Sequence, residues 1–140
     1  MTKQQHGLCL IIDNEKFEND VLPFREGSQI DANNLDILFQ ELGFQVTMRR
    51  NLNYNDMMTT ITEFSKKSEH FDAEMCIIIL LSHGESDGLI SAADGRSVSL
   101  VFRETRPFFS QPRVHPLWNE TITLASKLSS EMIFIFKNSI

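Results

Sequence analysis

The sequence predicts an α/β domain with a mostly parallel sheet and helices on both of its faces. Residues 7–13 and 75–81 are continuous apolar runs, which are typical of strands buried on both faces. Residues 28–42 and 53–68 carry apolar side chains at helical spacing, and they alternate with strand-like segments. The order strand, helix, strand, helix, strand favours parallel strands joined by right-handed crossovers.

The first predicted helix, residues 28–42, has a clear start and a clear end. Ser28 is a suitable N-cap, and Gly43 suits the left-handed turn that stops a helix. Residues 44–48 then form a second predicted strand. The apolar stripe expected to face the core consists of Ile30, Leu35, Leu38 and Leu42.

The second predicted helix, residues 53–68, is followed by the strongest strand signal in the chain. Asn53 or Asn55 is expected to cap this helix. The strand over residues 75–81 (MCIIILL) stops abruptly at a Ser-His-Gly-Glu sequence. The apolar stripe expected on the helix consists of Met57, Ile61 and Phe64.

The remaining chain is less regular. Two Asp-Gly pairs, at 87–88 and 94–95, flank short apolar pieces and predict a small hairpin. After Leu100 several prolines interrupt any long periodicity, and we expect a short helix over 121–128 and a final strand over 132–136. The predicted organisation is an N-terminal tail at 1–6, a core at 7–100 and a divergent C-terminal segment at 101–140.

Composition and charge exclude several classes of function. The net charge of −6 argues against nucleic acid as a partner, because phosphate binding needs clustered Lys and Arg. No apolar stretch is long enough to span a membrane, and the polar start lacks the apolar segment of a secretory signal. Cys9 and Cys76 lie inside apolar runs, so we expect buried thiols and a reducing, cytoplasmic location. No metal or cofactor is expected, since the histidines and cysteines lack metal-ligand spacing.

Polar residues follow two of the buried strands. Asp13-Asn14 ends the first strand, and Ser82-His83-Gly84 ends the third. In sheets of this type the functional crevice lies beyond the carboxyl ends of the strands. These residues are therefore predicted to lie at the functional edge.

Three colinear segments resemble the large subunit of caspases, which are aspartate-specific cysteine proteases. Residues 7–17 (GLCLIIDNEKF) resemble the opening strand of the family and its asparagine turn. Residues 25–35 (REGSQIDANNL), running into 42–44 (LGF), are similar to the stretch that leads into the family's first helix. Residues 76–85 (CIIILLSHGE) resemble the strand that carries the catalytic histidine. Over about residues 7–100, the resemblance implies a caspase-like three-layer sandwich, incomplete because only the large subunit is represented.

The resemblance implies a role for four residues. His83 matches the general base, and an imidazole suits proton transfer at neutral pH. Gly84 matches the glycine whose backbone N–H helps to form the oxyanion hole. Arg25 matches an arginine of the S1 pocket, where its fork fits the carboxylate of a substrate aspartate. Ser82 is expected near the same substrate-binding pocket.

Without the resemblance, these residues have plainer interpretations. His83 is then a hydrogen-bonded imidazole at the end of a strand, and Gly84 is a turn residue. Arg25 is then a surface cation paired with Glu26 or Asp31. The agreement of three motifs in one chain favours the functional interpretation.

The nucleophile that the resemblance implies is missing. The family signature, Gln-Ala-Cys followed by Arg, Gln or Gly and then Gly, stands about 50 residues after the histidine, and no cysteine follows Cys76. A base without a nucleophile cannot carry out covalent acyl transfer, so we expect no meaningful proteolysis. If residues 132–136 match the strand before that cysteine, Ser139 falls at its position and is an alternative nucleophile.

The sequence leaves three interpretations open. The first is a caspase-type protease domain, acting on peptides or proteins with Asp at P1, that is inactive here because the nucleophile and the small subunit are absent. The second is a non-enzymatic regulator that binds a caspase small subunit or another caspase. The third is a truncated, non-functional product whose last forty residues arise from alternative splicing or an erroneous gene model.

Overall fold

The computed structural model describes residues 6–84, 89–99, 120–125 and 131–137, with the last two ranges described as backbone only. Seven strands and two α-helices lie within these ranges. The strands are β1 (Gly7–Asp13), β2 (Phe44–Arg50), β3 (Met75–Leu81), β4 (Leu89–Ser91), β5 (Ser97–Ser99), β6 (Glu120–Ala125) and β7 (Glu131–Lys137). The helices are α1 (Ser28–Glu41) and α2 (Tyr54–Ser65), with short 3-10 helices η1 (Glu18–Asp20) and η2 (Ser68–Asp72).

Five of these strands form one sheet in the order β2-β1-β3-β7-β6. Strand β1 pairs in parallel with both β2 and β3, which confirms the predicted parallel arrangement. Strands β7 and β6 extend the sheet on the other side of β3 in antiparallel pairing. β4 and β5 form the predicted hairpin as a separate two-stranded sheet.

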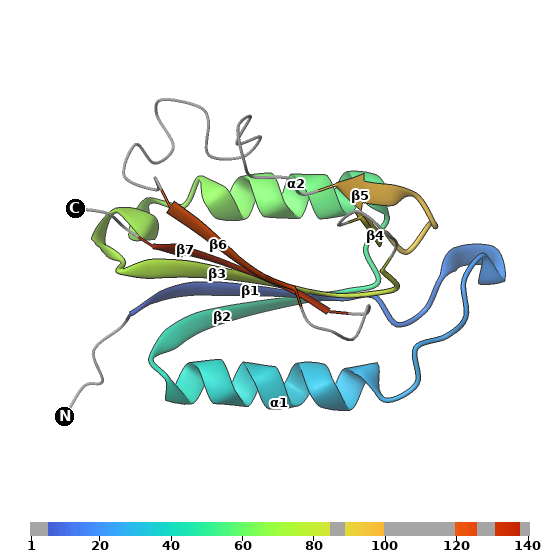
Figure 1. Ribbon diagram of the computed structural model, residues 1–140, viewed down its shortest axis with the longest axis horizontal. Helices are drawn as coiled ribbons and strands as arrows, with labels where there is room; N and C mark the ends of the chain where they lie inside the picture. Colours follow the sequence, from blue (N-terminus) through green and yellow to red (C-terminus); the bar gives the residue numbers. More distant parts are fainter. Residues whose placement is uncertain (1–5, 85–88, 100–119, 126–130, 138–140) are drawn as a thin grey trace.

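Helices cover both faces of the sheet, as predicted. Figure 1 shows α1 on one side of the strands and α2 on the other. Alternate residues of β1 and β3 point to the two faces because side chains alternate along a strand. One core cluster joins the sheet to α2 and the hairpin, and its members include Leu8, Leu10, Ile12, Ile78, Met57, Ile61, Phe64 and Val98. The other joins the sheet to α1, with Cys9, Ile11, Ile77, Ile79, Leu81 and Ala32. The structure is therefore a three-layer sandwich.

The predicted N-cap of α1 is wrong, and its predicted apolar stripe is right only at Leu35. Gly27 is the N-cap, in a left-handed conformation with φ of 83°, and Ser28 is the first helical residue. The buried face of α1 is built on Ala32, with Leu35 and Phe39 packed beside it. The other three residues of the predicted stripe are largely exposed, at 66% for Ile30, 46% for Leu38 and 50% for Leu42. Because the side chain of Ala32 is small, α1 can lie close to β1 and β2. The sheet then covers only a narrow face of the helix.

The short helix predicted over residues 121–128 is also wrong. Residues 120–125 form strand β6, which pairs with β7 from Glu120↔Lys137 to Ala125↔Met132. Threonine and isoleucine alternate in this segment, and β-branched residues favour strands. The final strand predicted over 132–136 is present as β7. None of the helices in the described residues has both the length and the apolar character needed to cross a bilayer.

Candidate active site at the carboxyl edge of the sheet

The carboxyl ends of β1 and β3 meet at one edge of the sheet, where the sequence placed the functional residues. The backbone N–H of Asn14 donates to the carbonyl of Leu81 at 2.8 Å, so the chain after β1 follows the end of β3. Beyond β3, the N–H of Ser91 donates to the carbonyl of His83 at 2.9 Å. Gly84 forms an isolated antiparallel bridge with Ile90. The backbone of His83 and Gly84 is therefore fixed by the hairpin.

The partly exposed side chain of His83 is held by two residues of the loop after β1. Its Nε2 lies 2.6 Å from the carbonyl oxygen of Pro23. Its ring packs against the ring of Phe17, with 5.0 Å between the centroids. A carbonyl oxygen can only accept a hydrogen bond, so Nε2 carries the proton in the neutral imidazole and Nδ1 carries the lone pair. The ring is thus oriented with Nδ1 as its basic atom.

Arg25 follows Pro23 by two residues in the loop after β1, and its guanidinium is directed inward. Nη1 donates to the hydroxyl of Ser28 at 2.6 Å and to the carbonyl oxygen of Asn14 at 3.1 Å. Nη1 also lies 3.5 Å from Oδ1 of Asp13, and the Arg25 side chain is only 10% exposed. The ion pair is therefore with Asp13, a residue to which sequence reasoning assigned no role.

Asp13 is a fully buried carboxylate at the end of β1. Its Oδ1 accepts a hydrogen bond from the Ser28 hydroxyl in addition to the contact with Arg25. Its Oδ2 accepts from Nη1 of Arg50 at 3.2 Å. A buried charge is stable only when it is paired and hydrogen-bonded, and both oxygens of Asp13 meet this condition.

Ser82 lies below the surface and binds the hairpin. It is 1% exposed, and its hydroxyl donates to the carbonyl oxygen of Ser91 at 2.6 Å. The side-chain amide of Asn14 donates to the same oxygen at 3.2 Å, and its Oδ1 accepts from the N–H of Leu52. These bonds tie together the ends of β1 and β3, the chain after β2, and β4.

The two cysteines are poor nucleophiles. Cys9 and Cys76 are free and fully buried in the middle of the sheet. Burial, with a smaller contribution from Asp36, raises the pKa of the Cys9 thiol to about 12. Burial also raises the pKa of the Cys76 thiol well above its ordinary value. Because the thiolate is the reactive form, neither residue can serve as the nucleophile. Within the described residues, no cluster of His, Cys, Asp and Glu could hold a metal ion.

Strand β7 ends at the opposite edge of the sheet from His83. In the antiparallel register Glu131 pairs with Leu81, whereas Lys137 pairs with Met75 at the start of β3. Met75 and Leu81 are the first and last of the seven residues of β3, so these positions are roughly 20 Å apart along an extended strand. Ser139, the alternative nucleophile, lies outside the described residues, two positions after Lys137.

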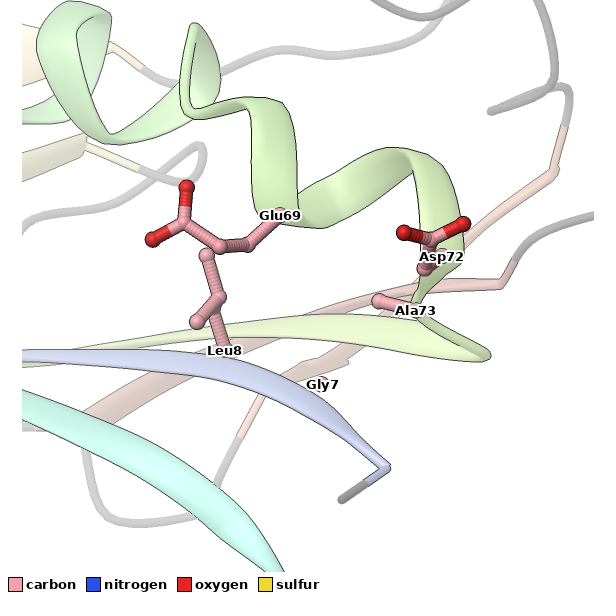
Figure 2. A pocket seen from close by; sticks show the side chains of 5 residues that line it. All are labelled: Gly7, Leu8, Glu69, Asp72 and Ala73. Atoms are coloured by element: carbon pink, nitrogen blue, oxygen red, sulfur yellow. The ribbon is translucent and has the colours of Figure 1, made fainter.

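A pocket at the opposite edge from His83 has a volume of about 220 Å³. Figure 2 shows Glu69 and Asp72 of η2 beside the start of β1 at Gly7 and Leu8. This pocket contains neither His83 nor Arg25, so it is separate from the candidate active site.

The structure brings together the four residues that the sequence singled out, at the ends of β1 and β3 and in the loop between β1 and α1. Sequence reasoning missed Pro23 and Phe17, which orient His83. It also missed the pairing of Asp13 with Arg25 and with Arg50. A backbone carbonyl such as that of Pro23 leaves no signal in the sequence. Asp13 did leave one, because a carboxylate ending a strand buried on both faces requires a cationic partner.

Comparisons with known proteins identify similar sequences. A family model of the caspase domain matches residues 6–136. The chain is similar to caspase-2 of Gallus gallus, with 35% identity over 71% of this chain and 24% of that protein. It is also similar to caspase-1-A of Xenopus laevis, with 42% identity over 59% of this chain and 21% of that protein. Cell death protein 3 of Caenorhabditis remanei is 42% identical over 63% of this chain and 16% of its own length. The chain thus spans about a quarter or less of these curated relatives.

Proposed function

Because the chain belongs to the caspase family, we propose that it supplies the general base and the aspartate-binding arginine of a peptidase site but does not by itself cleave peptide bonds. The substrate class is a peptide or protein with aspartate at P1, and the process is programmed cell death. The names of the relatives and the geometry of His83 and Arg25 support this proposal.

Each residue has a chemical role in this proposal. His83 accepts the proton of a nucleophile at Nδ1 and later returns it to the leaving amine, while the Pro23 carbonyl holds the proton on Nε2. The backbone N–H of Gly84 donates to the oxyanion that forms on the scissile carbonyl. Arg25 binds the carboxylate of the P1 aspartate with charge-assisted hydrogen bonds.

The direction of β7 is the observation that supports the absence of cleavage. A nucleophile must lie within hydrogen-bond reach of its base. The antiparallel register pairs Lys137 with Met75, so β7 ends at the edge remote from His83. Both cysteines are buried in mid-strand. No described residue therefore offers a reactive thiol to the base.

The first experiment measures hydrolysis of a fluorogenic acyl-aspartyl tetrapeptide by the purified chain. We expect turnover no greater than that of His83→Ala. Ser139→Ala is the matched control, since serine is the only side chain that the sequence offers at the nucleophile position. Turnover that is lost in both variants would overturn the proposal and make Ser139 the nucleophile.

The second experiment tests aspartate binding without cleavage. The chain is titrated by NMR with an acetylated tetrapeptide amide ending in aspartate, and with the same peptide ending in asparagine. A site that pairs a guanidinium with the carboxylate should favour aspartate by about tenfold or more. Arg25→Lys keeps the charge but loses the fork, so the preference should fall. Arg49→Lys, at a more exposed arginine, is the control and should leave it unchanged.

A regulator that binds another caspase chain is the second candidate function, and the outer face of α1 favours it. Ile30, Ile37 and Leu38 of this helix and Leu42 at its C-cap are all between 46% and 66% exposed. Exposed apolar patches of this kind mark interaction surfaces. In this function the chain would compete with productive assembly of the caspase, and it would require no nucleophile.

Co-purification tests the regulator directly. The chain is mixed with a caspase zymogen, or with its separate small subunit, and analysed by size-exclusion chromatography. Ile37→Lys should abolish co-elution if α1 is the contact, whereas Gln40→Lys, a polar position of the same helix, should not. If the unsubstituted chain does not co-elute, this candidate is contradicted and the interpretation as a non-functional product remains.

We also propose a cytoplasmic location. Cys9 and Cys76 are free thiols, and unpaired cysteines are typical of reducing compartments. Imaging of a tagged chain in cells would test the proposal, and a signal confined to the secretory pathway would contradict it.

A further inference from the structure

Asp13 is the one described acidic residue whose side chain is completely buried, and it lies beside Arg25. Its position at the end of β1 places it directly before the loop that carries Pro23 and Arg25. The roles described above for the candidate site do not use Asp13. Those roles therefore do not explain the hydrogen bonds and ion pairs of Asp13.

Asp13, Ser28 and Arg25 form a closed triangle of hydrogen bonds. The Ser28 hydroxyl donates to Oδ1 of Asp13, and Nη1 of Arg25 donates to the oxygen of that hydroxyl at 2.6 Å. Nη1 completes the triangle with its contact to Oδ1 at 3.5 Å. The carbonyl of Asn14 is a third acceptor for the same nitrogen, at 3.1 Å. The guanidinium cannot rotate without losing several of these bonds at once.

Arg50 fixes the carboxylate from its other side. Its Nη1 donates to Oδ2 of Asp13 at 3.2 Å, and its Nη2 donates to Oδ1 of Asn33 at 3.0 Å. Arg50 is also the register partner of Asp13 across β1 and β2. The sheet itself thus sets where the carboxylate lies, and the carboxylate in turn sets where Nη1 of Arg25 lies.

We propose that Asp13 is a positioning residue that orients the Arg25 guanidinium and thereby determines the selectivity of the site for aspartate. This inference rests on the proposed role of Arg25. An arginine held in advance loses less side-chain entropy when it binds a ligand, so its hydrogen bonds contribute more to affinity. The two N–H bonds of Nη1 have three inward acceptors, so this side of the guanidinium is held by the protein itself.

The Asp13→Asn variant tests this proposal by the NMR titration with the aspartyl and asparaginyl peptides. It keeps the shape of the side chain and removes its charge. We expect the preference for aspartate to fall about tenfold, towards equal binding. The 15Nε–1Hε signal of Arg25, assigned with Arg25→Lys, should also move to the position of a mobile arginine.

Arg50→Gln is the matched control, because it removes a partner of Asp13 without touching Arg25. It should lower the thermal midpoint of unfolding as Asp13→Asn does, yet retain most of the aspartate preference and the Arg25 signal, because Asp13 keeps its contacts with Arg25 and Ser28. If Asp13→Asn does not fold, Ser28→Ala replaces it, since this change removes the hydroxyl that joins Asp13 to Arg25. The preference should then fall in part.

The outcomes separate this inference from the proposed function. A preference that is lost in Arg25→Lys but unchanged in Asp13→Asn would show that Asp13 is merely structural, and would overturn the inference alone. A loss of preference in Arg50→Gln equal to that in Asp13→Asn would also overturn it. If the unsubstituted chain does not prefer aspartate, the proposed role of Arg25 is wrong and the inference fails with it.

Discussion

His70 shows how a single buried side chain makes stability depend on pH. The residue lies in η2, its side chain is fully buried, and its Nε2 is 2.7 Å from the carbonyl oxygen of Phe64. Its ring meets the edge of the Phe64 ring at 5.0 Å between centroids. Burial lowers the pKa of this imidazole, and the hydrogen bond to Phe64 opposes that shift only in part. The folded protein therefore holds His70 neutral at pH values where the unfolded chain takes up a proton.

We predict that acid destabilises the protein through His70. Below about pH 6.5 the unfolded state binds the proton first, so the free energy of unfolding falls as pH falls. The slope is at most about 1.4 kcal/mol per pH unit for one proton. His70→Gln keeps a donor for Phe64 but cannot titrate, so its stability should change less between pH 6.5 and 5. Urea unfolding followed by circular dichroism at several pH values measures the slope.

His6→Gln provides the comparison for this prediction. His6 is far more exposed and pairs with Glu74 at the surface. Comparing the acid slopes of the two variants separates the contribution of the buried histidine from that of a histidine at the surface. An acid slope that persists in His70→Gln would assign the effect to other groups.

Single residues also show the limit of what the sequence predicted about the site. The apolar run and its abrupt end correctly predicted that His83 and Gly84 follow a buried strand. The contacts of Arg25 did not follow, because they depend on Asp13, Ser28 and Arg50 converging from three elements. Side-chain pairing across elements is set by their packing, and local pattern does not encode it.

The start of α2 gives a prediction at the scale of one element. Sequence analysis left two capping residues open, and the structure selects Asn53, whose Oδ1 accepts from the N–H of Asp56 at 2.8 Å. Asn53→Ala should lower the free energy of unfolding by about 1 kcal/mol, because that N–H loses its partner. Asn55→Ala, inside the helix, should be neutral or slightly stabilising, since alanine has the higher helix propensity. Thermal and urea unfolding measure both, and equal losses in the two variants would contradict this assignment.

The two helices differ in how well periodicity predicted their buried faces. In α2 the large residues Met57, Ile61 and Phe64 are all buried, as predicted. In α1 the buried face is built on Ala32. A search for periodicity that gives most weight to large apolar side chains overlooks this residue. α1 lies over β1 and the edge strand β2, so less sheet area is available to cover its larger side chains.

At the scale of the whole molecule, the direction of one strand separates the possible functions. The sequence predicted a strand over residues 132–136 but could not give its orientation, since an apolar run pairs equally well in either direction. If β7 ran parallel to β3, the residues after it would reach the edge that carries His83. In the antiparallel register β7 ends beside Met75 instead. The proposed lack of a nucleophile near His83 therefore depends on this pairing.

Engineered cysteine pairs test the direction of β7. Residues directly opposite in an antiparallel pair are close enough for a disulfide. Met75→Cys combined with Lys137→Cys should cross-link on mild oxidation, because these positions are register partners. Met75→Cys with Glu131→Cys should not, since Glu131 pairs with Leu81 at the other end of β3. Non-reducing electrophoresis and mass spectrometry identify the product, and the buried Cys9 and Cys76 are left in place. If only the second pair cross-links, β7 runs parallel to β3. Ser139 would then follow the end of β7 at the His83 edge, and this result would favour an active serine variant of the family.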